Sequence, residues 1–142
     1  MAPPVPPSPV KLFVATLHQS DFHLDPVAKT LQDRFGEIDY VSEDFPFQDT
    51  DYYAAEMGTR LFRRFLSFAT LIDPADLAAV KLVTNSVEDD HRSESGRKVN
   101  LDPGTIDFYK VVLASTKFGG QKVYLRDGIY ADMTLVHFKG KW

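Results

Sequence analysis

The segment RKVNLDPGTIDFYKVVLASTK, residues 97–117, combines side chains that can bind an anion. Asn100 and Asp102 are two positions apart, so in a strand they would project from the same face. Gly104 has no side chain and would let a backbone amide approach a ligand closely. The cations of this segment are Arg97, Lys98, Lys110 and Lys117. These residue types predict an anion-binding loop.

Asp102, Pro103 and Gly104 also form a turn signature. Proline at the second position of a turn and glycine at the third fit a type II β-turn, so we expect the chain to reverse here. The alternative to a binding loop is a turn whose Asn100 and Asp102 side chains only satisfy neighbouring backbone amides.

Asp132 is a second carboxylate that can act together with Asp102. Asp132 lies two positions from Tyr130 and from Thr134, so the three side chains would share one face of a strand. If this strand lies beside the strand of Asp102, the two carboxylates can coordinate Mg²⁺ or act as general acid and base. Asp102 and Asp132 are therefore the predicted catalytic residues. A polar outer face is the alternative, and the residue types leave open whether the protein is an enzyme.

The segment TDYYAAEMG, residues 50–58, can supply the other wall of a pocket. Its tyrosine rings can stack on a base or a sugar. In a helix, Glu56 would share a face with Tyr52, four positions before it. Buried tyrosines that pack a lid are the alternative. The predicted ligand-binding residues are Asn100, Gly104, Lys117, Tyr53, Glu56 and Arg97.

Composition and charge exclude several classes of protein. The net charge of −4 argues against a nucleic-acid binder that works by charge alone. The absence of cysteine excludes disulfides, thiolate catalysis and cysteine-based zinc sites. His18, Asp21 and His23 lack the spacing of a helical metal-binding pair, so these three residues are not predicted to bind a metal ion. Without a signal-peptide pattern or an apolar run of about 18 residues, we expect a cytoplasmic protein that does not bind membranes.

The helices and strands that must position these residues are predicted from the spacing of apolar residues and from start and turn signals. Asp25-Pro26 and Asp73-Pro74 are helix start signals, and Asp127-Gly128 is a hairpin turn signal. The predicted strands cover residues 11–17, 38–45, 63–71, 98–101, 121–125 and 129–139. The predicted helices cover residues 25–36, 73–91 and 105–115, and residues 50–58 are expected to form a turn or short helix. For residues 105–115 a strand is the alternative, because Val111 and Val112 also suit one.

This order predicts a single α+β domain over residues 11–142. The first six major elements match a ferredoxin-like split β-α-β sheet with two helices on one face, and the C-terminal β-hairpin would extend the sheet. A doubly wound α/β fold is the alternative. Residues 1–10 hold five of the nine prolines and are expected to be a disordered tail.

Five segments occur in order along the chain: PFQDTDYYAAEMG, RRFLSFATLIDPADLAAVKLVTNSVE, RKVNLDPG, VVLASTK and VYLRDGIYADMTL. Through them the chain, from Lys11 to its end, resembles a bacterial family of uncharacterised proteins, domain of unknown function 4416. Some members of that family are labelled GTP-binding proteins, and similar sequences continue with a Trp- and Tyr-containing segment beyond Trp142. A P-loop requires G-x-x-x-x-G-K-[ST], which does not occur here, so a P-loop GTPase is excluded.

Two functional hypotheses follow. The first is a protein that binds a small phosphate-bearing ligand or nucleotide in a pocket lined by the NLDPG and STK segments. The second is a non-catalytic interaction or dimerisation module that uses a sheet edge. A ligand-binding protein should bring Asp102, Asp132 and Lys117 around one pocket, whereas an interaction module should leave them dispersed and expose an apolar patch.

Overall fold

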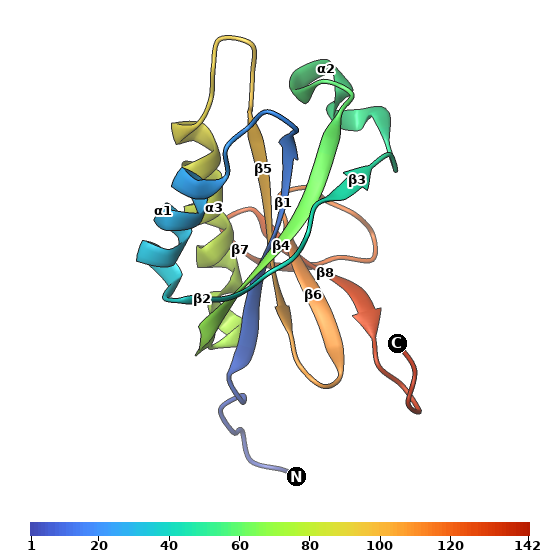
Figure 1. The fold of residues 1–142 in the computed structure, drawn as a ribbon. Coiled ribbons are helices and arrows are strands. Elements are labelled where there is room, and N and C mark those ends of the chain that lie inside the picture. The colour runs from blue at the N-terminus through green and yellow to red at the C-terminus, as the bar shows by residue number, and fades with distance from the viewer.

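The computed structural model describes residues 1–142 and contains one sheet of eight strands with three α-helices (Figure 1). The strands are β1 Val10–Gln19, β2 Ile38–Val41, β3 Phe45–Phe47, β4 Leu61–Ile72, β5 Val99–Ile106, β6 Lys110–Ser115, β7 Val123–Arg126 and β8 Ile129–Val136. The helices are α1 Asp25–Phe35, α2 Ala54–Met57 and α3 Leu77–Asp90, with short 3-10 helices η1 Asp51–Tyr53 and η2 Pro74–Asp76. None of the helices is both long and apolar enough to cross a membrane.

Every strand pairing in the sheet is antiparallel. The strand order is β2-β4-β1-β5-β6-β8-β7, and β3 pairs with β4 beside the end of β2. The predicted α+β class is confirmed. The doubly wound alternative is wrong, because that fold needs parallel strands joined by crossover helices.

Helices α1 and α3 cover one face of the sheet (Figure 1). Val27 and Leu31 of α1 pack with Val80 and Val87 of α3 in a core of eleven buried residues. On β1, Leu12 and Val14 contribute to the same core, as alternate positions of a strand should. The side chains of α3 that face the sheet, Leu77, Val80, Thr84 and Val87, are all buried.

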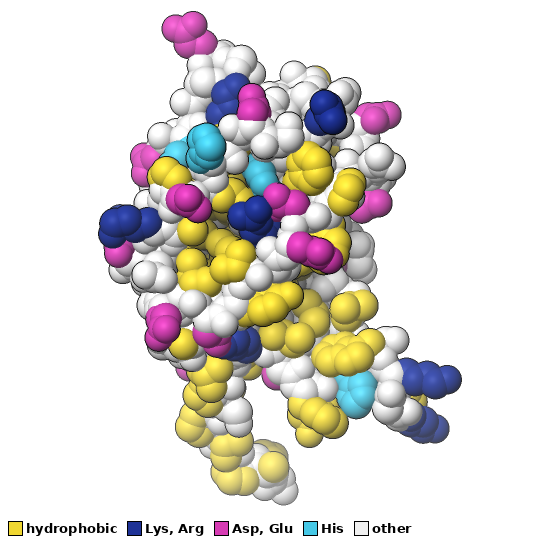
Figure 2. Space-filling model, in the orientation of Figure 1, with side chains coloured by type: hydrophobic (Ala, Val, Ile, Leu, Met, Phe, Trp, Pro, Cys, Tyr) yellow, Lys and Arg dark blue, Asp and Glu magenta, His cyan; other side chains and the backbone are white.

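Only the start of α3 packs on the outer strands β6 and β8. A smaller cluster lies there, formed by Leu77, Ala78, Ala114 and Ile129. Many large apolar side chains of this region are exposed, among them Phe108, Tyr109, Met133 and Phe138. Figure 2 shows hydrophobic side chains gathered at the end of the molecule where both termini lie.

The predicted type II turn at Asp102-Pro103-Gly104 is wrong, since all three residues belong to β5. Pro103 lies opposite Val14 of β1. The N–H of Leu101, two positions earlier, bonds to a side chain of α3. Residues two apart in a strand direct their backbone nitrogens to the same side, so the nitrogen of Pro103, like that of Leu101, points away from β1. The proline therefore costs the sheet no hydrogen bond to β1.

Gly104 is required by packing. It lies opposite Phe13 of β1 and Leu113 of β6. A Cβ at this position would lie 2.5 Å from Cζ of Phe13 and 2.9 Å from a methyl group of Leu113. The absence of a side chain at Gly104 therefore leaves the space that the ring of Phe13 occupies.

The predicted helix over residues 105–115 is also wrong, because β5 leads through a tight turn into β6. At this turn Oδ1 of Asp107 accepts hydrogen bonds from the N–H groups of Tyr109 and Lys110. Val111 and Val112 then continue as a strand, which suits their branched side chains.

The hairpin predicted at Asp127-Gly128 is confirmed, and both residues have positive φ angles, 53° and 77°. The predicted strand over residues 38–45 is divided into β2 and β3, with Pro46 inside the short edge strand β3. Residues 1–9 have no regular secondary structure, and β1 begins at Val10. The disordered tail stays a prediction.

Candidate functional site

A polar cavity opens where β5 and β6 separate. β5 pairs with β1 along its whole length, whereas it pairs with β6 only through Gly104, Thr105 and Ile106. Beyond Gly104 the two strands diverge and leave a cavity of about 420 Å³ lined by 15 residues, of which three are hydrophobic. The lining residues come from four segments of the chain: residues 52–56, 81–92, 97–102 and 114–117.

Side chains from both faces of the sheet reach this cavity. Helix α3 lies on the face of Val99 and Leu101, which pack in its core. Leu17 points to the opposite face, where it packs with Met57 and Tyr53 of the η1–α2 segment. Asn100 and Asp102 lie opposite Leu17 and Ala15, so they share that second face. The gap between β5 and β6 therefore joins groups that a continuous sheet would keep apart.

Two side chains of α3 take the place of the missing strand partner at Leu101. The carboxylate of Glu88 accepts a hydrogen bond from the N–H of Leu101 at 2.6 Å. The ammonium group of Lys81 donates to the carbonyl oxygen of Leu101 at 2.8 Å. Both side chains are buried, and a buried backbone amide without a partner would be costly. The open edge of β5 is thus satisfied without a neighbouring strand.

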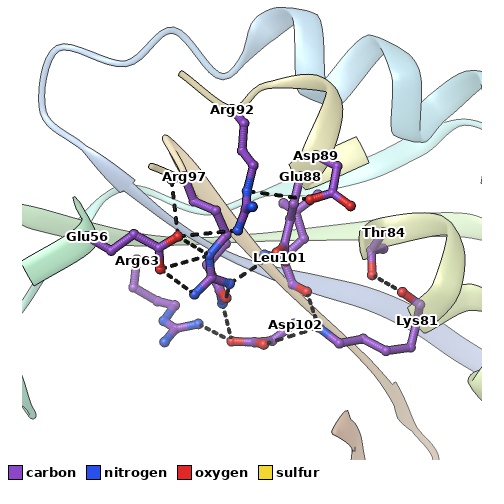
Figure 3. Close-up of polar contacts among 11 residues, drawn as sticks. Glu56, Arg63, Lys81, Thr84, Glu88, Asp89, Arg92, Arg97, Leu101 and Asp102 are labelled. Carbon is purple, nitrogen blue, oxygen red and sulfur yellow. Dashed lines mark hydrogen bonds and ion pairs between the residues drawn. The ribbon is translucent and has the colours of Figure 1, made fainter. Parts of the chain in front are cut away.

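Arg97 is the centre of the charge network (Figure 3). Its guanidinium donates to both carboxylate oxygens of Glu56 at 2.9–3.1 Å, to Glu88 at 3.2 Å and to Oδ1 of Asn100 at 3.0 Å. These contacts with Arg97 lower the pKa of Glu56, and its carboxylate partners raise the pKa of Arg97. Burial raises the pKa of Glu88. Arg97 therefore joins α2, α3 and β5 on the cavity wall.

Asp102 accepts hydrogen bonds from two side chains and forms an ion pair with a third. Nδ2 of Asn100 donates to Oδ2 of Asp102 at 2.9 Å, as expected for neighbours on one face of a strand. The guanidinium of Arg63 on β4 lies 3.4 Å from the same carboxylate, and Nζ of Lys81 lies 3.6 Å from it. The Asp102 side chain keeps 27% of its surface exposed. It is therefore a fixed negative charge at the cavity wall.

Lys117 is the cation of the cavity that forms no ion pair. Its ammonium group lies 3.4 Å from the centre of the Tyr52 ring, in a cation–π contact. This neighbour lowers the pKa of Tyr52, whereas burial raises the pKa of Tyr53. Arg92, in contrast, lies 3.5 Å from Glu56 and 3.5 Å from Asp89. Lys117 is thus the most available positive charge for an incoming anion.

The structure brings most of the predicted residues together. Six of them line the cavity: Tyr53, Glu56, Arg97, Asn100, Asp102 and Lys117. Gly104 lies outside it and is packed under Phe13. Asp132 also lies outside, with Nζ of Lys122 at 3.4 Å from its carboxylate. Lys122 donates to Oγ of Ser115 at 2.9 Å, so Asp132 is linked to the cavity rim but does not line it.

The predicted use of Mg²⁺ needs Asp102 and Asp132 side by side, and only Asp102 lines the cavity. No group of three or more His, Cys, Asp or Glu side chains that could hold a metal ion is present.

Sequence reasoning missed Lys81 and Glu88, the two most deeply buried charges of the site. Their signal was their spacing. Lys81 lies one position after Val80 and Glu88 one after Val87, so both belong to the inward face that these apolar residues define. A charged residue at an inward position of an amphipathic helix indicates a polar partner in the core.

The fold and the site define an α+β protein with a charged cavity at a break in an antiparallel sheet. The family model described as "Domain of unknown function (DUF4416)" matches residues 8–142, so the chain belongs to that family and the resemblance is confirmed. No curated protein and no solved structure matches the chain.

Proposed function

We propose that the cavity between α3, η1–α2, β5 and the end of β6 binds a small phosphate-bearing ligand. The observation that carries this proposal is the convergence of four sequence segments on one polar cavity that contains a lysine without an acidic partner. The volume of about 420 Å³ is within the range of small-molecule sites.

The charge balance favours a ligand with few negative charges. The lining cations are Lys81, Arg92, Arg97 and Lys117, and the lining acids are Glu56, Glu88, Asp89 and Asp102. All of these groups except Lys117 are engaged in ion pairs with one another or with Arg63. One free ammonium group and the neutral side chains of Asn85 and Thr116 suit a single phosphate better than a triphosphate.

Tyr52 gives the ligand a second contact. Tyr52 is 59% exposed at the cavity rim. A phosphate that attracts Lys117 would draw the ammonium group from the Tyr52 ring and free that ring for stacking on a base. The nucleotide class, and a nucleoside monophosphate in particular, therefore fits the site best.

A thermal-shift titration with inorganic phosphate, ribose 5-phosphate, GMP and GTP tests the proposal. Saturating ligand at 100 times its dissociation constant stabilises a protein by about 2.7 kcal/mol. We expect a shift with GMP that is at least as large as the shift with GTP, and that Lys117→Ala removes. Asp102→Asn should weaken it, because Lys81 and Arg63 lose the charge that positions them.

Lys29→Ala is the matched control, since Lys29 is exposed on α1 and pairs only with Asp33. This variant should bind as the wild type does. An equal shift in Lys117→Ala and the wild type, or no shift with any of the four ligands, would contradict the proposal.

The arrangement of the first strands supports a ferredoxin-like assignment for the part of the fold that carries the site. The strands β2, β4, β1 and β5 follow one another in an antiparallel sheet, with α1 and α3 on one face. Under this proposal the site lies at the β5 edge of the unit, where the extension by β6, β8 and β7 begins.

A second candidate function is self-association through the free edge of β7. β7 is the last strand of the sheet, and all four of its residues are exposed. Val123 and Tyr124 have 65% and 56% of their surface exposed. An apolar edge without a covering element is able to pair with the same edge of a second copy.

Sedimentation of Val123→Lys, compared with wild type, tests this alternative. A charge on the edge should remove a dimer that the wild type forms. Leu82→Lys is the control, because Leu82 is exposed on α3, away from the β7 edge. A wild type that stays monomeric at all concentrations would contradict dimerisation.

A further inference from the structure

A second cavity lies at the other end of the β5–β6 pairing. Its volume is about 550 Å³, and 14 residues line it. Its walls come from the N-terminal segment, the start of α3 and strands β6, β7 and β8, and none of its lining residues belongs to the first cavity. This position follows from the coverage of the sheet, because α1 and α3 pack mainly on β1, β4 and β5, and only the start of α3 reaches β6 and β8.

The floor and walls of this cavity are mainly apolar. Seven of the 14 lining residues are hydrophobic, and Pro7, Pro9 and Pro74 add further apolar surface. Thr105 and Val112 are cross-strand neighbours on the floor, and Leu77 of α3 lies over them. Thr105 is opposite Leu12 of the core, which places its side chain on the helix-covered face.

Thr105 contributes an isolated polar group to this apolar floor. The residue is only 6% exposed and lines the cavity. Its hydroxyl has no hydrogen-bond partner within the protein. Unlike Nδ1 of His18, which is enclosed in the core, this hydroxyl is open to the cavity. A hydroxyl in such a position gains a partner when a ligand brings one.

The charges at the cavity rim neutralise each other. Nζ of Lys110 lies 2.6 Å from Oδ2 of Asp107, and Oδ1 of Asp107 is used by two backbone N–H groups of the turn. Both residues line the cavity, and no other charged residue does. A charged head group would therefore lose its hydration here without meeting an unpaired opposite charge.

We propose that this cavity is a second binding site, for a neutral and mainly apolar molecule with one hydrogen-bonding head group that meets Thr105. The apolar body lies against Leu77, Val112, Leu125 and Ala131, and the segment of Pro7, Ser8 and Pro9 forms the outer wall. This site is independent of the phosphate-binding cavity, since the two share no lining residue.

Three probes of equal chain length test the proposal: 1-octanol, octanoate and octylammonium. Binding is measured by chemical-shift titration of the ¹⁵N-labelled protein, with the amide signals of Thr105 and Val112 as reporters. We expect saturable shifts with 1-octanol and affinities about tenfold lower for both charged probes. Equal affinities for the three probes would overturn the assignment of a neutral ligand.

Two variants separate the site from a general apolar surface. Thr105→Val keeps the shape of the side chain and should weaken 1-octanol binding about fivefold, the effect of one lost hydrogen bond, while the melting temperature is unchanged or higher. Val112→Phe fills the cavity and should abolish binding. If Thr105→Val binds 1-octanol as tightly as the wild type does, the role of the hydroxyl is wrong.

Lys117→Ala is the control for independence. It alters the phosphate-binding cavity and should leave 1-octanol binding unchanged. Phosphate binding by Thr105→Val should likewise be unchanged, so that failure of either site is recognised separately.

Discussion

The ammonium group of Lys81 donates a hydrogen bond to the carbonyl oxygen of Leu101 at 2.8 Å, from a side chain that is 7% exposed. Seven positions later on the same face of α3, Glu88 accepts from the N–H of Leu101. A helix thereby supplies the donor and the acceptor that a neighbouring strand would supply. This arrangement allows β5 and β6 to part, and the gap between them is the charged cavity.

Lys81→Met should destabilise the fold while preserving the apolar stem. The carbonyl of Leu101 would lose its partner, and Asp102 would lose one of its two neighbouring cations. A buried acceptor without a partner costs about 1–3 kcal/mol. Urea denaturation measures the change in the free energy of unfolding. Lys29→Met, on the exposed surface of α1, is the control and should change it by no more than about 0.5 kcal/mol. Equal effects of the two variants would contradict the structural role of Lys81.

Gly104→Ala should destabilise the sheet through overcrowding. The new Cβ would lie 2.5 Å from the ring of Phe13, and a packed interior yields to such a contact only by shifting. Overpacking of this kind costs about 1–3 kcal/mol, which a thermal melt detects. Gly120→Ala is the control, since a Cβ added there would meet no atom within 4 Å and the φ of Gly120 is not positive. Phe13→Leu should lessen the effect of Gly104→Ala, and strictly additive effects would argue against direct contact.

The sequence predicted strands and helices well where both local pattern and burial agreed. The two Asp-Pro helix starts and the Asp127-Gly128 hairpin are of this kind. It failed at Asp102-Pro103-Gly104, where a turn signature is overruled by pairing with β1 over eight positions. The signature could not show that Phe13 needs a glycine opposite it, because that requirement arises between residues far apart in the chain.

The candidate site was partly predictable for a similar reason. Asn100, Asp102 and Lys117 were chosen for their chemistry, and they do line one cavity. Lys81 and Glu88 were overlooked because an inward face was expected to be apolar. Asp132 can act together with Asp102 only if their two strands are neighbours. In the sheet β6 lies between β5 and β8, a relationship that strand patterns alone do not encode.

His18 should make stability depend on pH. Burial lowers the pKa of His18 below its ordinary value of 6.5, and its Nδ1 has no hydrogen-bond partner. Below pH 6.5 His18 becomes protonated in the unfolded chain but stays neutral in the folded protein. The free energy of unfolding therefore falls as the pH falls toward the pKa of His18 in the folded protein. His18→Leu should therefore lose less stability than wild type between about pH 7.5 and pH 5.5. Denaturation curves at both pH values measure this difference.

His23→Gln is the control for this titration, because His23 is exposed beside the same strand end. It should show the pH dependence of the wild type. If His18→Leu and the wild type lose the same stability on acidification, burial of the neutral imidazole is not the cause.

Arg97→Lys should weaken the charge network even though the charge is retained. A lysine has no planar fork, so it cannot contact both oxygens of Glu56 and also reach Glu88 and Asn100. The buried carboxylate of Glu88 would lose a hydrogen-bond donor, and the free energy of unfolding should fall by about 1–3 kcal/mol.

A double-mutant cycle identifies the source of that loss. Glu88→Gln keeps an oxygen for the N–H of Leu101 but removes the negative charge, so it should relieve part of the effect of Arg97→Lys. Arg92→Lys is the matched control, because Arg92 is 54% exposed and its acidic partners are 3.5 Å away. If Arg97→Lys and Arg92→Lys lower the free energy of unfolding equally, the planar guanidinium of Arg97 adds no stability. A larger decrease for Arg97→Lys, which Glu88→Gln then reduces, would establish Arg97 as the residue that joins α2, α3 and β5.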